Sequence, residues 1–345
     1  MTAPTMQDVA RLAGVSVKTV SNVINDYPYI RAETRTRVEH AIDELGYQLN
    51  TSARSLRSGR TRTLGLALPE LSLPYFAELA DRVIRAARRS GQVVQVETTN
   101  GDRTRELDLL RSPRLQFLDG LIFSPLGITP DDIDALPKAL PVMLLGERIF
   151  GAPADHVTMH NVKAAAAATS HLVALGRRRI AVIGEHPDEV VGSAGLRLRG
   201  YREGLEQAGI DYDPALVVPA GLWHRANGAS AMRELLGRGA AFDAVFAFND
   251  TLALGAMRVL EEAGYRIPED VAVMGFDDLD ESQYSLPSLS SVDPGRAEIA
   301  DLAVSMLLER IEGRVPEAPR LVEAPFAIVD RESTLGQGVD TSSSM

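Results

Sequence analysis

The chain predicts an all-α helix-turn-helix head followed by an α/β core of two doubly wound parallel-sheet lobes. Over residues 5–25, apolar side chains recur at helical spacing, and the pattern breaks once, at a glycine. From residue 63 onward, short apolar runs alternate with amphipathic stretches in two successive series. A length of 345 residues is too great for one small hydrophobic core and is enough for two or three domains.

The first two helices are predicted on either side of Gly14. Thr5 and Asp8 have the spacing of a capping box at the start of the first helix. Gly14 can turn the chain at positive φ, and Ser16 can accept hydrogen bonds from the first free N–H groups of the second helix. Two short helices joined by such a turn form a helix-turn-helix unit. Periodicity alone leaves an ordinary helical hairpin open as the alternative.

The second helix has an apolar face and a polar face. Val20, Val23 and Ile24 share the apolar face. The opposite face is small, polar and basic, which suits a surface that enters a DNA major groove. That face carries Val17, Lys18, Ser21 and Asn22, with Thr19 and Asn25 at its margins.

The pattern D-V-A-x-x-A-G-V-S-x-x-T-V-S-x-V-x-N, from Asp8 to Asn25, closely resembles the DNA-binding head of the lactose/galactose repressor family. The resemblance implies a sequence-specific transcriptional regulator, most often a repressor, that binds pseudo-palindromic double-stranded operator DNA as a homodimer. It implies base-edge contacts by Val17, Lys18 and Asn22. It also implies contacts, mainly to phosphates, by Thr5, Ser16, Thr19, Ser21 and Asn25. Family members often carry Arg where this chain has Asn22, so we expect adenine rather than guanine to be read there.

The charge of the chain is divided between its two ends. The net charge is −11, yet residues 1–62 carry nine basic and six acidic side chains, +3, which leaves −14 for the remainder. A basic head on an acidic body is consistent with phosphate contact at one end only. The sequence has no cysteine, which excludes disulfides and thiolate chemistry. We expect no cofactor, no metal site, no membrane segment and no leader peptide, and therefore a cytoplasmic, nucleoid-associated protein.

A third helix over residues 32–45, ending at Gly46, completes the predicted head, residues 1–46. Ile30-Arg31 stands where relatives often have Ser, so this helix should lack a side-chain cap. Residues 47–60 resemble the hinge helix of the family, which forms against DNA. Its implied DNA-contacting residues are Asn50 as N-cap, Ala53, Arg54, and Leu56 as an apolar wedge in the minor groove. Leu49 replaces a common Pro, and a polar linker is the alternative interpretation.

The core is predicted over residues 61–335, with a disordered tail at 336–345. The expected strands lie at 64–68, 93–97, 119–124, 142–146, 179–184, 244–249 and 271–276, with late strands near 289–293 and 321–328. The expected helices lie near 75–90, 103–115, 162–175, 196–208, 227–237, 250–263 and 297–312. The family resemblance implies a periplasmic-binding-protein-like core whose late segments cross between lobes. Lobe 1 is then about 61–161 and 291–322, and lobe 2 about 162–290 and 323–335.

Ligands of such sheets bind beyond the carboxyl ends of the strands. In the second series the loops there carry Arg197, Trp223, Asn249 and Asp277, which match the sugar-contacting positions of the family. An aromatic plane, a guanidinium, a carboxamide and a carboxylate suit a polyhydroxylated ligand. Each residue also has a structural alternative: Arg197 could be a surface ion pair, Trp223 could be packing, and Asp250 could cap the next helix.

The corresponding loops of the first series offer further candidates for the effector site. They are Glu70, Tyr75, Phe76, Ser124 and Glu147, although sugar-binding relatives often have Asp near position 147. The predicted effector is a small carbohydrate-like molecule that lowers operator affinity, although a co-repressor is physically equally possible.

Two other classes compete with a regulator. The body also resembles periplasmic sugar-binding proteins, which makes a solute-binding protein for transport the main alternative. An enzyme is not predicted, because the chain contains no G-x-S-x-G, H-E-x-x-H or G-x-x-x-x-G-K-[ST] motif.

Overall fold

The computed structural model describes residues 4–24, 27–47, 60–187, 189–315 and 318–336. The chain divides into two compact units, a head unit, Met1–Thr61, and a core unit, Arg62–Met345. Each unit has its own hydrophobic core. None of the described helices is long and apolar enough to cross a membrane.

The described residues of the head unit form three helices, α1 (Met6–Ala13), α2 (Val17–Ile24) and α3 (Ala32–Leu45). Their interior faces bury Val9, Val20, Val38 and Ala41. The predicted capping box is present, with the Thr5 backbone N–H donating to the Asp8 carboxylate at 2.9 Å. Gly14 turns the chain at φ 64°, and the Thr19 N–H donates to Ser16 Oγ at 3.1 Å. As expected from Ile30-Arg31, α3 has no side-chain cap.

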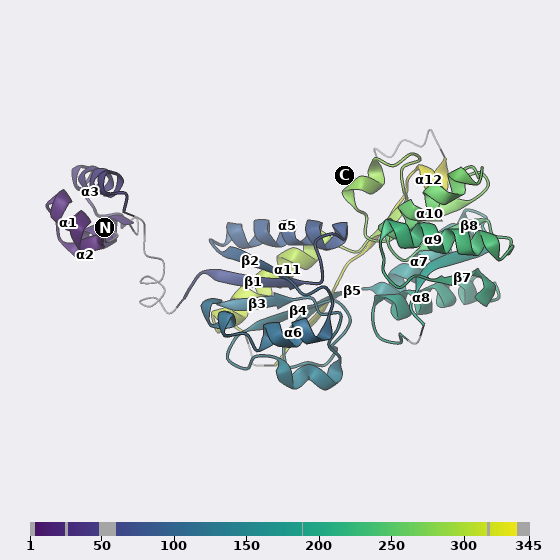
Figure 1. Ribbon diagram of the computed structural model, residues 1–345, viewed down its shortest axis with the longest axis horizontal. Coiled ribbons are helices and arrows are strands. Elements are labelled where there is room, and N and C mark those ends of the chain that lie inside the picture. The colour runs from purple at the N-terminus through teal and green to yellow at the C-terminus, as the bar shows by residue number, and fades with distance from the viewer. Residues whose placement is uncertain (1–3, 25–26, 48–59, 188, 316–317, 337–345) are drawn as a thin grey trace. The chain divides into compact units, whose positions relative to one another are not determined.

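The first lobe of the core is built on a six-stranded parallel sheet (Figure 1). Its strand order is β11-β5-β4-β3-β1-β2, and every pairing is parallel. The strands are β1 (Thr63–Leu68), β2 (Val93–Thr98), β3 (Gly120–Phe123), β4 (Val142–Leu145), β5 (Asp155–Met159) and β11 (Leu321–Ala324). The helices are α5 (Pro74–Arg89), α6 (Arg103–Leu110) and α11 (Arg296–Ile311), with 3-10 turns at Pro113–Phe117 and Pro130–Ala135. Alternate side chains of the sheet pack on α5 and α11 or on α6.

The second lobe has a four-stranded parallel sheet of order β7-β6-β8-β9. Its strands are β6 (Ile180–Glu185), β7 (Val217–Pro219), β8 (Ala244–Ala247) and β9 (Ala272–Met274). Its helices are α7 (Asn161–Ala174), α8 (Ser193–Gln207), α9 (Arg225–Gly237) and α10 (Asp250–Glu262), with 3-10 turns at Pro214–Leu216 and Asp280–Gln283. Along β6, Ile180 and Val182 face the cluster of α7 and α8, whereas Ala181 and Ile183 face that of α9 and α10. The doubly wound fold class is therefore confirmed.

Three crossings join the lobes. The chain leaves the first lobe after β5, returns between β10 (Ser291–Asp293) and α11, and leaves again after β11. β10 pairs in antiparallel fashion with β12 (Ala327–Val329), and α12 (Glu332–Leu335) follows. The strand β11 pairs with β5 through Ala324, so the last crossing lies two residues beyond the expected position near 322.

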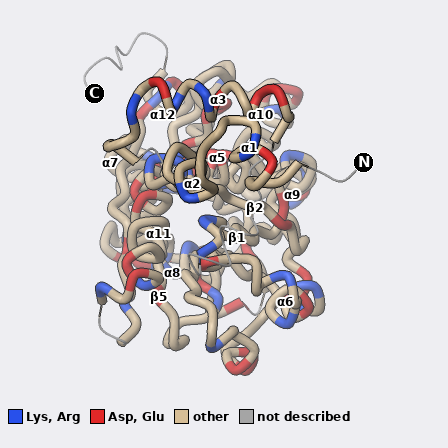
Figure 2. Tube along the Cα trace, turned by 90° about the vertical axis from the view of Figure 1, so that its left-hand side faces the viewer, with Lys and Arg blue, Asp and Glu red and all other residues tan. Residues whose placement is uncertain are grey.

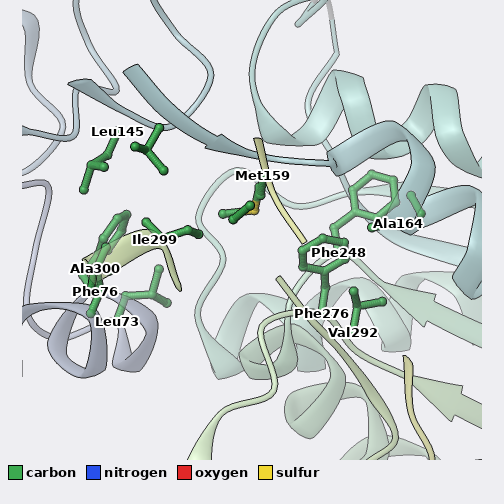
Figure 3. Close-up of a cluster of buried hydrophobic side chains, with 14 of the residues drawn as sticks. Leu73, Phe76, Leu145, Met159, Ala164, Phe248, Phe276, Val292, Ile299 and Ala300 are labelled. Atoms are coloured by element: carbon green, nitrogen blue, oxygen red, sulfur yellow. The ribbon is translucent and has the colours of Figure 1, made fainter. Parts of the chain in front are cut away.

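The hydrophobic cluster at the junction has two groups of side chains (Figure 3). Leu73, Phe76, Leu145, Ile299 and Ala300 lie on the first-lobe side, and Ala164, Phe248, Phe276 and Val292 lie on the second-lobe side. Met159, the last residue of β5, lies between the two groups (Figure 3). The labelled apolar side chains thus form one group in each lobe, and they meet at Met159, where the chain first crosses between the lobes.

Four details differ from the sequence-based expectations. The apolar run at 93–97 predicts a buried strand, but β2 is the edge of the first sheet, and all six of its residues are exposed or half-buried. The expected helix 103–115 ends at Leu110, and a 3-10 turn follows Pro113. The expected strand 321–328 is two strands in different sheets, separated at Pro325, which cannot donate to a ladder. The strands β5 and β7 were not predicted, since one is polar in sequence and the other is very short.

Candidate functional site

A cavity of about 180 Å³ lies between the two lobes of the core. Side chains from both lobes line it, at the carboxyl ends of the parallel strands, as expected for a doubly wound sheet. All nine residues predicted as effector contacts lie in its lining: Glu70, Tyr75, Phe76, Ser124, Glu147, Arg197, Trp223, Asn249 and Asp277.

Arg197, from α8, is the most enclosed cation of the cavity. Only 2% of it is exposed, so it is not a surface ion pair. Its Nε donates to Asn161 Oδ1 at 2.8 Å, its Nη1 donates to the Phe248 carbonyl, and its guanidinium lies 3.5 Å from the ring centroid of Phe276. Burial lowers the pKa of Arg197, an effect that the nearby Asp277 carboxyl opposes. The guanidinium is therefore fixed in place before any ligand arrives.

Trp223 both packs against the core and lines the cavity. Its indole N–H donates to the Gly184 carbonyl at 3.1 Å, so the protein already satisfies its polar atom. The ring centroid lies 5.2 Å from Arg197 Cζ and 6.2 Å from the ring centroid of Phe248. What Trp223 offers to a ligand is its ring surface.

Asn249, rather than Asp250, is the N-cap of α10. Asn249 Oδ1 accepts from the Leu252 N–H at 2.9 Å, and Asn249 Nδ2 donates to the Trp223 carbonyl at 3.1 Å. Asn249 thus ties the helix start to the loop of Trp223. Asp250 is the first residue of the helix and is fully buried, and burial raises its pKa to about 6.

Asp277 follows β9 and is 5% exposed. Its carboxylate lies 3.9 Å from Arg197 Nη2 and, among the described residues, accepts no hydrogen bond. Burial, with a contribution from the Asp250 carboxylate, raises the pKa of Asp277 to about 8, although Arg197 and Arg296 act in the opposite direction. This carboxyl group faces the cavity with its hydrogen-bonding capacity unused.

The first-lobe side of the cavity is more apolar. Tyr75 and Phe76 from α5 lie there with an edge-to-face ring contact of 5.2 Å. Burial raises the pKa of the Tyr75 hydroxyl. Ser124 follows β3, and Glu70 pairs with His224 of the second lobe at 3.1 Å.

Glu147 connects the two lobes through hydrogen bonds. Its Oε1 accepts from Thr158 Oγ1 at 3.1 Å and from Asn161 Nδ2 at 2.8 Å. Its Oε2 accepts from Ser193 Oγ, at the start of α8, at 2.8 Å. Sequence reasoning did not select Thr158 or Ser193. Thr158 lies in the strand that was not predicted, and one hydroxyl in a glycine-rich segment carries no distinctive pattern.

The head unit presents the polar face that the sequence predicted on α2. Thr5, Ser16, Val17 and Lys18 are exposed, whereas Thr19, Ser21 and Asn22 are half-buried. The helix α2 carries one basic residue, Lys18, and no acidic residue, whereas α6 carries both basic and acidic residues (Figure 2). Five predicted DNA contacts lie outside the described residues: Asn25, Asn50, Ala53, Arg54 and Leu56.

A helix-turn-helix unit carried by a chain whose core encloses a ligand-sized cavity defines a DNA-binding transcriptional regulator. Residues 5–50 match the model of bacterial regulatory proteins of the lacI family, and residues 169–334 match that of a periplasmic binding protein-like domain. The chain belongs to the LacI family of bacterial regulatory proteins. The predicted family is thereby confirmed, and the transport alternative gains no support.

Several characterised proteins are similar over nearly the whole chain. The HTH-type transcriptional regulator CelR of Thermobifida fusca is 36% identical over 96% of this chain and 98% of its own length. A solved complex of the regulator CelR with cellobiose is 33% identical, with a TM-score of 0.71, and the match covers 96% of this chain and 99% of that one. The Lac repressor dimer bound to operator and the anti-inducer ONPF is 28% identical, with a TM-score of 0.82 and the same coverage. These relatives are regulators rather than enzymes.

Proposed function

We propose that this regulator is a homodimeric, cytoplasmic repressor whose operator affinity is controlled by a small uncharged carbohydrate bound in the cavity. The observation that carries this proposal is the convergence of all nine predicted contacts, from both lobes, on one cavity. The cellobiose complex of CelR and the operator-bound dimer of the Lac repressor support the ligand class and the assembly.

The chemistry of the cavity suits a neutral polyol. The Trp223 ring can stack on the apolar face of a sugar, while the Asp277 carboxyl and the Ser124 hydroxyl can bind its hydroxyl groups. An anionic ligand would meet the Glu147 carboxylate and, among the described lining residues, only one deeply buried cation, Arg197.

On the DNA side, we propose that the exposed face of α2 enters the major groove. Val17, Lys18 and Asn22 then contact base edges, and Thr5, Ser16, Thr19 and Ser21 mainly contact phosphates. Asn25, at the end of the same helix, is proposed to contact phosphates as well. Residues 47–60 are proposed to form a hinge helix on DNA, with Asn50 as its N-cap, Ala53 allowing close approach, Arg54 on a phosphate and Leu56 in the minor groove.

We propose that the bound sugar acts as an inducer, so that sugar binding lowers the affinity for operator DNA. A sugar that closes the lobes changes the direction in which the paired hinges leave the core, and operator affinity falls by a coupling free energy of typically about 1–3 kcal/mol. A ligand that instead raises operator affinity would identify a co-repressor and would leave the rest of the proposal intact.

The sole tryptophan makes the ligand test direct. Purified full-length protein is titrated with monosaccharides, with cellobiose as the two-ring comparator, and Trp223 fluorescence and the melting temperature are followed. A true effector shifts both, since binding to the folded state raises apparent stability. If no sugar shifts either signal at millimolar concentration, the carbohydrate class is wrong.

The DNA test uses a duplex selected from a randomised pool. Affinity should fall steeply with salt, because phosphate contacts release counterions, and should fall again when the effector is added. An Asn22→Arg variant should shift the preferred base from adenine toward guanine. Failure to bind any duplex at low salt would remove the regulator proposal.

A further inference from the structure

The turn after β9 contains two consecutive non-glycine residues in the left-handed half of φ space. Asp277 has φ 115° and Asp278 has φ 50°. L-residues are disfavoured there, and such a conformation persists only where the surrounding structure enforces it. Because Asp277 lines the cavity, whatever holds this turn also sets the direction of the Asp277 carboxyl.

Arg296 clamps the backbone of this turn. It is the first residue of α11 and is 4% exposed. Its Nη1 donates to the carbonyl of Asp277, and its Nη2 donates to the carbonyl of Asp278 at 2.6 Å. The guanidinium thus binds the carbonyl oxygens of both left-handed residues rather than their carboxylates.

The next residue of the turn is fixed from the other side. The Leu279 N–H donates to the Asp250 carboxylate at 2.8 Å, and the Asp278 N–H donates to Ser291 Oγ at 3.0 Å. These bonds hold the ends of the turn but leave its two carbonyls to Arg296. The Asp278 carboxylate is in turn paired with Arg331 Nη2 at 2.6 Å. Within the described residues, Arg296 is the donor that binds the two backbone carbonyls of the left-handed residues.

Arg296 is paired with a second first-lobe helix. Its Nη2 lies 3.0 Å from Glu78 Oε2, and Glu78 belongs to α5. The other oxygen of Glu78 accepts from the Asp280 N–H, in the same turn, at 3.1 Å. Two paired side chains from the first-lobe helices α11 and α5 therefore bind both ends of the second-lobe turn.

We propose that Arg296 is a positioning residue for effector binding, which holds the Asp277–Asp278 turn so that the Asp277 carboxyl points into the cavity. Through Glu78 it makes this arrangement depend on the position of α5. This inference rests on the proposed function of the cavity.

The decisive variants separate positioning from general stability. In Arg296→Met the clamp is lost, and we expect sugar affinity, measured by Trp223 fluorescence, to fall roughly tenfold or more. Arg296→Lys should recover only part of this loss, because an ammonium cannot reproduce the planar fork on two carbonyls. The matched control is Arg310→Met, which removes another partly buried arginine, paired with Asp155 in the first lobe at 2.5 Å. This control should lower the melting temperature and leave sugar affinity within roughly twofold.

Glycine provides the rescue. Asp278→Gly and Asp278→Ala both remove the ion pair of Asp278 with Arg331, but only glycine adopts positive φ without a clamp. Added to Arg296→Met, Asp278→Gly should therefore restore more of the affinity than Asp278→Ala. A merely structural role for Arg296 predicts no difference between the two double variants, and that result would overturn the proposal.

A readout independent of the ligand keeps the two proposals distinguishable. In a crystal structure of the Arg296→Met variant without sugar, Asp277 and Asp278 should leave positive φ. If both keep their present conformation, the positioning role is wrong. If the wild-type protein binds none of the sugars tested but the turn relaxes as expected, the proposed carbohydrate function fails while the clamp stands.

Discussion

The two walls of the cavity are built on different principles. The second-lobe wall, Arg197, Trp223, Asn249 and Asp277, consists of polar groups held by other parts of the protein, with Asp277 alone unsatisfied. The first-lobe wall, Glu70, Tyr75, Phe76, Ser124 and Glu147, lies beside apolar side chains such as Leu79 and Ile299.

The hydroxyl groups of the first-lobe wall are less constrained. Neither the Tyr75 nor the Ser124 hydroxyl has a protein hydrogen-bond partner among the described residues. Pre-organised polar groups on one side and free hydroxyls on the other suggest that a ligand is oriented by the second lobe and then enclosed by the first. Two carboxylates of this wall differ from its hydroxyls. Glu70 pairs with His224, and Glu147, the fuller exception, makes all its hydrogen bonds within the protein.

The largest effect should come from the most constrained residue. In Arg197→Met, the oxygen atoms of Asn161, Phe248 and Asp277 lose their buried partner. We expect effector affinity to fall by roughly a hundredfold or more and the free energy of unfolding to fall by about 3 kcal/mol. Titration calorimetry and urea unfolding measure the two losses. Unchanged affinity would show that the second-lobe wall does not orient the ligand.

Asp277 should make the stability of the protein depend on pH, and Asp277→Asn should remove this contribution. Its pKa is about 8 in the folded state, against an ordinary value of 3.8, so the folded state keeps a proton that the unfolded state has lost. The free energy of unfolding therefore declines as pH rises from the ordinary pKa of 3.8 to the folded-state pKa of about 8. The decline is up to about 1.4 kcal/mol per pH unit, and it levels off above this window. Asp250, with a pKa of about 6, contributes to the lower part of the window.

The same ionisation should act on the ligand in the opposite sense. Sugar hydroxyls donate better to the ionised carboxylate, so effector affinity should rise between about pH 6 and about pH 9. In Asp277→Asn the effector affinity, measured by Trp223 fluorescence, should not change with pH over this range. A wild-type affinity that falls with pH would contradict the assignment of Asp277 as an acceptor.

Glu147→Gln tests the exception in the first-lobe wall. An amide cannot accept all three hydrogen bonds, and the resulting mismatch should cost about 1–3 kcal/mol of stability as well as weaken the effector roughly fivefold or more. Ser193→Ala is the matched variant, because it removes only the bond between Glu147 and α8, for about 1 kcal/mol. Equal effects of the two variants would place the whole contribution of Glu147 in that single contact.

The smallest effects should come from the free hydroxyls. Tyr75→Phe and Ser124→Ala remove no hydrogen bond within the described protein, so the melting temperature without ligand should not change. Effector affinity should fall by up to about tenfold for each hydroxyl that the sugar uses. A stability loss in either variant would show that these groups already have partners in solution, and the contrast between the walls would disappear.

Sequence reasoning succeeded where a residue's role depends on its neighbours in the chain. The Thr5 capping box, the Gly14 turn and the uncapped start of α3 are local features, and each is present. The loops after the strands could be located because parallel strands end at one edge of the sheet. Nothing local distinguishes Asn249 from Asp250 as a helix cap, since either side chain can accept at that position.

The features that were missed depend on contacts distant in sequence. The exposure of β2 follows from its place at the end of the strand order, which its apolar pattern does not encode. The bond between Glu147 and Ser193 and the clamp of Arg296 each join segments of different lobes. Sequence periodicity and residue spacing cannot predict such pairs, because the residues become neighbours only when the chain crosses between the lobes.

Those crossings also bear on how the protein is made. The outermost strand of the first sheet ends at Ala324, and α11, which packs against that sheet, is itself translated after the second sheet. The ribosome must therefore synthesise nearly the whole polypeptide before either lobe has all its parts. We expect neither lobe to fold as an excised fragment, and nascent chains to need protection from aggregation until β11, β12 and α12 have been synthesised.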